Sequence, residues 1–356
     1  MAVCFKTLPI SQLLRHNRFA RDIINKINNM AVISVQNLKK FYKVHQKEPG
    51  FLGSLKSLVK RKYYDVKAVD DVSFEIQEGE LVGFIGPNGA GKTTTLKCLS
   101  GLLYPTAGSI SVLGFNPWDR KHSFLKQISL VMGQKNQLWW DLPAIETFNL
   151  NKEIYEVPDS QYKKTLDELV QLLGIEDILK VQVRKLSLGQ RMKCELIAAL
   201  LHSPKILFLD EPTIGLDVVS QKKILDFVRD YNKSHQATII LTSHYMGDIE
   251  QLCQRVMIID NGRLCFDGQL SDIVQKYADH KLVSLILDKE VDPSVVAKVF
   301  PVKEYNFPKL VLMPKREQVT GITSRALEQL PVKDLSIEEP AIEDIIRELF
   351  TGKDYA

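Results

Sequence analysis

A glycine-rich loop directly after an apolar run restricts the possible folds more than any other feature. Residues 81–85 read Leu-Val-Gly-Phe-Ile, a run typical of a buried strand in a parallel sheet. Residues 86–93 read Gly-Pro-Asn-Gly-Ala-Gly-Lys-Thr and fit the phosphate-loop pattern G-x-x-x-x-G-K-S/T. Glycines let backbone N–H groups curl around phosphate oxygens, and a helix beginning near Lys92 adds its dipole. We therefore predict a nucleotide site built from a strand, a loop and a helix.

The residues expected to hold the nucleotide lie in this loop and at the start of the helix. Lys92 is placed to reach the β and γ phosphates, and Thr93 to ligate Mg²⁺. The cofactors implied are thus ATP and Mg²⁺. The full set of candidates from this loop is Gly86, Pro87, Asn88, Gly89, Ala90, Gly91, Lys92, Thr93 and Thr94.

Strand-like and helix-like segments alternate along the chain. Apolar runs at 206–209 and 238–241 have the texture of buried parallel strands. Helical patterns lie at about 92–103, 160–174, 188–202 and 219–234, and strand patterns begin at Val32 and again at Ala68. This alternation predicts an α/β fold with a parallel sheet.

Polar side chains follow the two later strands directly. Asp210 and Glu211 come after the run 206–209, and His244 follows the run 238–241. The carboxyl ends of parallel strands meet at one edge of a sheet, where such folds bind ligands. Asp210 is a natural partner for Mg²⁺, and Glu211 could orient or deprotonate an attacking water. The alternatives are an ordinary exposed strand end for the carboxylates and a structural histidine.

The segment 186–190 reads Leu-Ser-Leu-Gly-Gln and has two interpretations. Ser187 and Gln190 have the spacing of a capping box, which predicts that a helix begins here. The residues beyond it, Met192, Leu196, Ala199 and Leu200, lie on one helical face. The helix N-terminus could hold an anion, or the segment could simply be a well-capped packed helix.

The order of these motifs resembles the ATP-binding cassette of ABC transporters, over residues 30–277. The signature of that family, LSGGQ, reads LSLGQ here, so that Leu188 departs from it at the third place while Ser187 and Gly189 are kept. Because of the departure, how closely the backbone approaches the nucleotide at this turn stays open.

The resemblance assigns roles residue by residue. It implies a catalytic set of Glu211, His244 and Gln134, and a metal-binding set of Thr93, Gln134 and Asp210. Gln134 is matched to the family's Q-loop by counting back from Leu142-Pro143, which selects it over Gln137. Further nucleotide contacts are implied for Tyr42, which matches the aromatic residue that stacks on adenine, with Phe41 as a second candidate, and for Ser187, Gly189, Gln190 and Asp217.

The resemblance also implies architecture and partners. The expected fold is a P-loop NTPase cassette, a mostly parallel sheet with an antiparallel β subdomain and a helical lobe. Such cassettes work as dimers, with each ATP held between the P-loop of one subunit and the signature of the other. The expected partners are a second cassette, identical or related, and a separate transmembrane permease. The protein is then peripheral, at the cytoplasmic face of the membrane.

Composition agrees with a soluble ATPase subunit. The chain has 356 residues and a net charge of +4, which is too weak to indicate nucleic acid. Its five cysteines form no C-x-x-C pair, so neither a zinc site nor a disulfide framework is supported. No stretch approaches the roughly 18 apolar residues that a membrane helix needs.

We expect three segments in the chain: an N-terminal extension over 1–29, the cassette over 30–277 and a small α+β domain over 278–356. The extension is basic and precedes a fresh start at Met30. A misassigned start codon, a surface helix and a targeting peptide all fit it. Residues 43–67 look like a basic insert, either a solvated loop or a segment near anionic lipid headgroups.

For the task that ATP performs, we favour transport, and export over import. The insert after Tyr42, the Gly-Gln-Lys around Gln134 and the ending over 336–340 resemble the type-2 exporter branch of the family. Trp139 and Trp140 are expected either to dock a permease or to pack in the lobe. The alternatives are a soluble ABC ATPase that acts on ribosomes or DNA and a plain ATP-binding regulator.

Overall fold

The structure is a computed structural model that describes residues 31–45, 63–243, 245–277 and 279–350. Within it the chain divides into two compact units, one of residues up to His244 together with Met257–Cys265, the other of Tyr245–Val256 and Phe266 onward. The predicted boundary at 277/278 differs from this division and stays a prediction. The extension over 1–29 lies outside the described residues.

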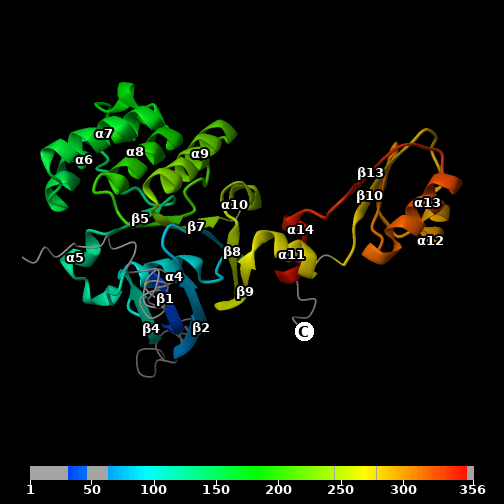
Figure 1. Cartoon of the computed structure of the whole chain (residues 1–356), viewed down its shortest axis with the longest axis horizontal. Helices are drawn as coiled ribbons and strands as arrows, with labels where there is room; N and C mark the ends of the chain where they lie inside the picture. Colours follow the sequence, from blue (N-terminus) through cyan, green and yellow to red (C-terminus); the bar gives the residue numbers. More distant parts are fainter. Residues whose placement is uncertain (1–30, 46–62, 244, 278, 351–356) are drawn as a thin grey trace, which may run out of the picture. The chain divides into compact units, whose positions relative to one another are not determined.

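A six-stranded sheet, ordered β5-β6-β7-β3-β8-β9, forms the centre of the cassette (Figure 1). β5, β6, β7 and β3 pair in parallel, with Asp210 of β6 beside Thr242 of β7. This confirms the predicted α/β fold. The bounds are β3 (Leu81–Ile85), β5 (Ile128–Met132), β6 (Ile206–Asp210), β7 (Thr238–Ser243), β8 (Arg255–Asp260) and β9 (Arg263–Gln269).

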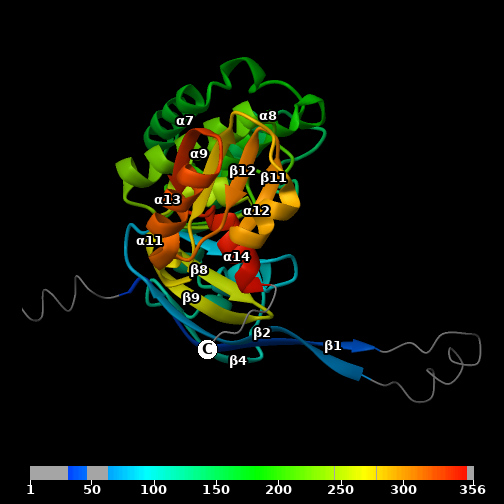
Figure 2. The ribbon, with the colours of Figure 1, turned by 90° about the vertical axis from the view of Figure 1, so that its right-hand side faces the viewer.

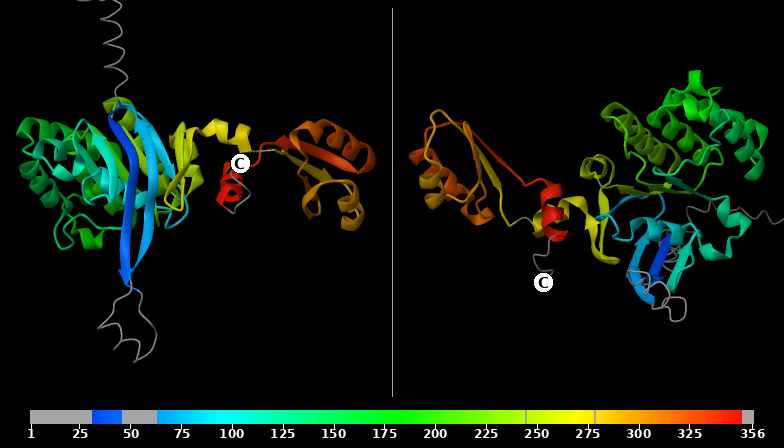
Figure 3. Two further views of the ribbon diagram at one scale, coloured as in Figure 1. Left: turned by 90° about the horizontal axis from the view of Figure 1, so that it is seen from below. Right: turned by 180° about the vertical axis from the view of Figure 1, so that it is seen from behind.

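A three-stranded antiparallel sheet, β2-β1-β4, forms the expected β subdomain. It contains β1 (Ile33–His45), β2 (Tyr63–Ile76) and β4 (Ala107–Val112). β4 pairs with β1 only as far as Lys39, and beyond it β1 and β2 continue side by side as a two-stranded ribbon (Figures 2 and 3). The two ends of the predicted insert thus belong to strands, while 46–62 lies outside the described residues.

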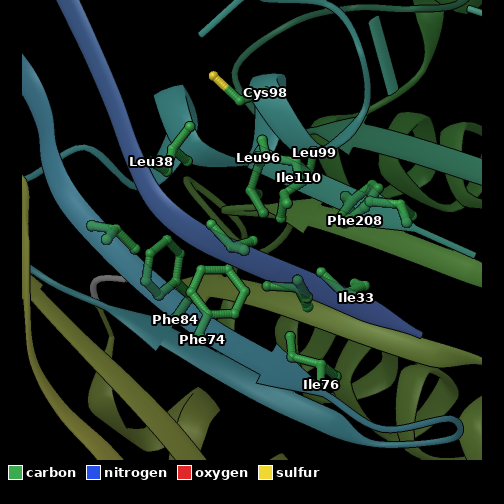
Figure 4. Packing of buried hydrophobic residues seen from close by; sticks show 14 of the residues in the cluster. Ile33, Leu38, Phe74, Ile76, Phe84, Leu96, Cys98, Leu99, Ile110 and Phe208 are labelled. Carbon is green, nitrogen blue, oxygen red and sulfur yellow. The ribbon is translucent and has the colours of Figure 1, made fainter. Parts of the chain in front are cut away.

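The helix that follows the P-loop, α4 (Lys92–Leu99), contacts both β2 and β6. Its apolar side chains join one core with residues of the two sheets (Figure 4). Leu96 and Leu99 of α4, Phe84 of β3 and Phe208 of β6 are all essentially inaccessible to solvent. Burial of this helix fixes the direction in which its N-terminus points, and therefore the place of the phosphate loop.

The helical lobe consists of α6 (Ala144–Ile154), α7 (Asp159–Leu173) and α8 (Leu188–Leu200), with α9 (Val218–His235) beside it (Figure 1). α8 is central, because it contacts α6, α7, α9 and strand β5. A short helix, α5 (His122–Leu125), precedes β5, and 3-10 turns lie at Pro117–Asp119, Glu176–Ile178 and Val183–Lys185.

The second unit contains the small α+β domain that the sequence predicts. Its antiparallel sheet, ordered β11-β12-β10-β13, has the connectivity βαββαβ. Alternate residues of β10, Val283, Leu285 and Leu287, are buried with Val296 of α12 and Ala326 of α13 in one core. The elements are β10 (Leu282–Leu287), α12 (Pro293–Val299), β11 (Val302–Asn306), β12 (Lys309–Leu312), α13 (Val319–Gln329) and β13 (Val332–Glu338), with α10 (Met246–Leu252), α11 (Leu270–Tyr277), α14 (Ile342–Phe350) and a 3-10 turn at Arg316–Gln318 in the same unit.

Candidate nucleotide site

The loop between β3 and α4 depends on glycine at specific positions. Gly89 and Gly91 have φ angles of +85° and +109°, which side chains rarely adopt. A Cβ on Gly91 would lie 2.4 Å from the carbonyl oxygen of Ala68, and one on Gly86 only 2.2 Å from that of Ile259. The loop is therefore pressed against its neighbours, while its tip, Asn88 and Gly89, is exposed to solvent.

The Lys92 side chain folds back into this loop. Its ammonium donates to the carbonyl oxygens of Gly86, at 2.5 Å, and Pro87, at 3.1 Å. Burial lowers the pKa of Lys92, and the nearby charges of Glu211 and Asp210 act in the opposite direction. The cationic group thus lies within the loop that matches the phosphate-binding pattern.

Asp210 joins three elements at the carboxyl edge of the sheet. Its carboxylate is almost buried and accepts a hydrogen bond from the hydroxyl of Thr93, the second residue of α4, at 2.7 Å. The other carboxylate oxygen accepts from the hydroxyl of Thr242, at the end of β7, also at 2.7 Å. Thr242 is a site residue that the sequence reasoning missed, although a hydroxyl at the end of a buried strand was a signal for it.

Gln134 and Glu211 lie together at the same edge. The Gln134 amide donates from Nε2 to Oε2 of Glu211 at 3.2 Å. The loop of Gln134 is held close, since the N–H of Gly133 donates to the carbonyl oxygen of Asp210 at 2.9 Å. A Cβ on Gly133 would lie 2.0 Å from the carbonyl oxygen of Glu211, so only glycine permits this approach. Glu211 itself has a φ of +52°, uncommon for a residue with a side chain.

These side chains surround a hollow of about 150 Å³. Its lining carries a hydroxyl, two carboxylates, an amide and two ammonium groups, from Thr93, Asp210, Glu211, Gln134, Lys97 and Lys135, with Met132. The structure therefore brings together Thr93 of α4, the carboxylates at and just after the end of β6, and Gln134, which only the family resemblance had placed here.

The remaining predicted site residues are Tyr42 with its alternative Phe41, Thr94 and His244. Tyr42 lies on β1 with 38% of its surface exposed, enough to receive a planar ligand on its ring. The ammonium of Lys40 lies 5.2 Å from the centre of that ring. Phe41 is covered instead by Lys67, at 5.5 Å. Thr94 is half-buried on α4. His244 lies outside the described residues.

The signature segment forms a separate group at the N-termini of α8 and α9. Ser187 and Gln190 make the predicted capping box, with each side chain accepting from the other residue's backbone N–H. Gly189 is buried, and a Cβ there would lie 2.7 Å from Oγ of Ser220. Asp217 caps α9 by accepting from the N–H of Ser220 at 2.9 Å, and contacts with Ser220 lower the pKa of Asp217.

Leu188, the departure from the family pattern, packs beside this group. Its Cδ2 is 3.1 Å from where a Cβ on Gly215 would lie. The side chain therefore fills space beside the segment that leads to Asp217, and Ser187 is left exposed at the start of α8.

Comparison with known proteins agrees with this geometry. A family model described as "ABC transporter" matches residues 69–214, and one described as "EvrA-like ABC transporter, C-terminal domain" matches residues 279–338. The chain is 33% identical over 226 residues to the "ABC transporter ATP-binding protein NatA" of Bacillus subtilis, an alignment that covers 64% of this chain and 92% of NatA. The chain belongs to the ATP-binding proteins of ABC transporters. As such a subunit it binds ATP and hydrolyses it to drive transport.

Other relatives of this ABC subunit differ in the functions that their names give. It is 33% identical to the "Linearmycin resistance ATP-binding protein LnrL" of Bacillus subtilis, covering 64% of this chain and 72% of LnrL. It is 31% identical to a "Methionine import ATP-binding protein MetN" of Halalkalibacterium halodurans, covering 83% of both chains. A solved structure, "Structure of ATP binding subunit of ABC transporter", superposes with a TM-score of 0.58 at 27% identity, over 69% of this chain and 92% of that one.

Proposed function

We propose that this subunit holds Mg²⁺ and ATP between its own P-loop group and the signature group of a second cassette, and that hydrolysis there drives export through a separate permease. One observation carries the proposal. The catalytic candidates Glu211 and Gln134 touch each other beside the P-loop, whereas exposed Ser187 begins a different helix in a different group. A second chain would bring the two groups to one nucleotide.

The residues beside the P-loop fit a Mg²⁺ ion. Mg²⁺ in nucleotide enzymes takes one or two carboxylates, hydroxyls, waters and phosphate oxygens rather than a cage of protein ligands. The Thr93 hydroxyl and the Asp210 carboxylate are already 2.7 Å apart, and the Gln134 amide lines the same hollow. We assign these three residues to the metal. When bound, Mg²⁺ neutralises charge on the β and γ phosphates.

The remaining residues bind the phosphates and the adenine of ATP and activate the attacking water. Lys92 leaves its loop carbonyls to contact the β and γ phosphates, while the loop N–H groups and the N-terminus of α4 hold the other oxygens. Tyr42 stacks on adenine. Glu211 orients and deprotonates the attacking water, with Gln134 fixing the position of its carboxylate. His244 is proposed to contact the γ phosphate, on the strength of its position in the sequence.

Asp210→Asn tests the metal assignment. The amide keeps the shape but loses the charge, so ATP hydrolysis is expected to fall by about 100-fold or more. ATP binding measured without Mg²⁺ should stay within about twofold of wild type, and the gain in affinity on adding Mg²⁺ should disappear. Asp226→Asn, on the surface of α9, serves as the control. Equal stimulation by Mg²⁺ in both variants would remove Asp210 from the site.

The proposed permease site is a groove on the cassette. It has a volume of about 300 Å³ and an apolar lining from Leu102, Leu125, Ile128, Leu130 and Ile154. Gln137, three residues after Gln134, also lines it. Beyond it the Trp139 and Trp140 side chains are 57% and 49% exposed, which argues against packing inside the lobe. Exposed aromatic side chains beside an apolar groove suit a docking surface.

Trp139→Ala and Trp140→Ala are expected to weaken permease binding by about tenfold or more each, because exposed tryptophans at docking surfaces contribute about 2 kcal/mol or more. The melting temperature of the isolated subunit should change by less than about 2 °C. Both quantities are measured on purified subunit, the first by capture with the permease. A clearly lowered melting temperature with intact capture would support core packing instead.

The proposed location is peripheral, at the cytoplasmic face of the membrane. In the described part of the chain no helix combines the length and the apolarity that a membrane span needs. Docking to a permease then holds the subunit at the membrane. The alternative of a soluble ATPase that acts on ribosomes or DNA has no support among the relatives compared.

Export is the proposed direction, since the insert after Tyr42 and the surroundings of Gln134 resemble the exporter branch. The test uses proteoliposomes of the complex with the cassettes outside. A panel of antibiotics and lipids should stimulate ATP hydrolysis when it is added on the cassette side. Stimulation only by compounds enclosed on the opposite side would indicate import, as the name of the MetN relative suggests for that protein.

A further inference from the structure

An ion pair with a buried carboxylate lies on α8, the helix that the signature segment begins. Nε of Arg191 is 3.6 Å from Oε1 of Glu195, one turn later on α8. Glu195 is only 2% exposed. Neither carboxylate oxygen of Glu195, nor Nε of Arg191, has a hydrogen-bond partner among the residues that the structure describes. The Glu195 carboxylate is therefore enclosed and incompletely satisfied, while the Arg191 side chain keeps 19% of its surface exposed.

The pair faces the segment that leads from Gln134 to the exposed tryptophans. The backbone N–H of Gln137 lies near the Glu195 carboxylate, outside hydrogen-bond geometry, and opposes the rise in its pKa. The Arg191 guanidinium lies 6.0 Å from the centre of the Trp140 ring. The side chain of Gln137 is anchored to the central sheet, where it donates to the carbonyl oxygen of Leu130 at 3.0 Å. The pair thus lies beside this segment, close to the point where Gln137 is anchored on the sheet.

The same segment is tied to the residues just before the signature. The N–H of Arg184 donates to the carbonyl oxygen of Trp140 at 3.0 Å, and the N–H of Val183 to that of Leu142, also at 3.0 Å. Residues 140–142 are therefore hydrogen-bonded to residues 183–184, a few residues before α8 begins. Arg191 and Glu195 lie between Gln137 and the rest of α8.

Stability alone is a poor explanation for this pair. Burial of a charged carboxylate without hydrogen bonds is unfavourable even beside a cation, and apolar side chains of similar volume in place of such a pair are often as stable or more stable. Burial raises the pKa of Glu195 to about 7, which shows how strongly the site disfavours the charge. A pair retained against this penalty has a role other than holding the lobe together.

We infer that the Arg191–Glu195 pair is a positioning device that keeps the signature helix α8 in register with the segment from Gln134 to Trp140. This inference rests on the proposed function. Gln134 serves the ATP bound by its own chain, whereas Ser187 serves the ATP bound by the partner cassette. The pair therefore links the two nucleotide sites of a dimer, and links both to the surface proposed to dock the permease.

The test replaces the pair by apolar side chains of similar size, Arg191→Met with Glu195→Leu, in the full chain. The expected result is an unchanged or higher melting temperature, a KM for ATP within about twofold of wild type and a kcat lowered by about tenfold, because small misplacements of catalytic groups slow turnover strongly. The control is the ion pair of Asp226 and Arg229 on α9, replaced by Leu and Met, with kcat unchanged.

Glu195→Gln provides a second variant in case the double replacement does not fold. The amide keeps the size of the side chain and removes its charge, so kcat should fall with KM unchanged. A wild-type kcat in the folded double variant, or in Glu195→Gln, would overturn the inference. Lys92→Ala is measured in parallel: if it too kept wild-type turnover, the proposed function would fail, and not the positioning role alone.

Discussion

Glu211→Gln is expected to leave ATP binding intact and to lower ATP turnover by about 100-fold or more, the usual contribution of a general base. The glutamine matches the glutamate in shape, so the φ of +52° at this position and the contact with Gln134 remain possible. With the base removed, ATP stays between the two cassettes. The variant should therefore accumulate as an ATP-bound dimer, which wild type forms only transiently.

The measurements are steady-state ATP hydrolysis and size-exclusion chromatography in ATP and Mg²⁺. Wild type should elute mainly as a monomer during turnover, and the variant as a dimer that dissociates when ATP is removed. Asp226→Asn, at a half-buried carboxylate paired with Arg229 in the middle of α9, is the matched control and should behave as wild type. Undiminished turnover by Glu211→Gln would remove Glu211 from the mechanism.

Mixing two inactive variants is expected to restore activity. Lys92→Ala removes the P-loop ammonium and Ser187→Ala removes the signature hydroxyl, so each homodimer has two damaged sites. A mixed dimer has one intact site, formed by Lys92 of one chain and Ser187 of the other. For random exchange at equal concentrations, half of the dimers are mixed, which predicts about a quarter of wild-type sites.

This experiment needs two controls. Ser187 caps α8, so its replacement by alanine is expected to destabilise the chain by about 1 kcal/mol, and assays must be run well below the lowered melting temperature. A mixture of Ser187→Ala with Lys92→Ala/Ser187→Ala has no intact composite site and should stay inactive. If subunits exchange and the first mixture stays as inactive as the second, each ATP is served by a single chain.

Much of the cassette could be predicted from sequence because local signals and tertiary structure agree there. The apolar runs at 81–85 and 206–209 became β3 and β6, and the capping spacing at Ser187 became an actual capping box. In each case the sequence pattern and the element that it predicts lie within the same short segment.

What could not be predicted depends on partners distant in sequence. Thr242 reads as an ordinary strand end until β7 places it against Asp210. Glu195 reads as a polar residue on a helix, yet it is buried, and the backbone N–H that opposes the rise in its pKa belongs to Gln137, more than fifty residues away. The division between the two units also differs from the predicted boundary, because residues 245–256 belong with the second unit by spatial contact.

The central claim, that this ATPase drives a separate permease, is tested most directly by purification from its native membranes in mild detergent, with identification of the proteins that accompany it. We predict a multi-span membrane protein in a fixed ratio to the subunit, lost when Trp139 and Trp140 are both replaced by alanine. Recovery only from the soluble fraction, alone or with ribosomes or DNA, would contradict the claim while leaving the ATP site intact.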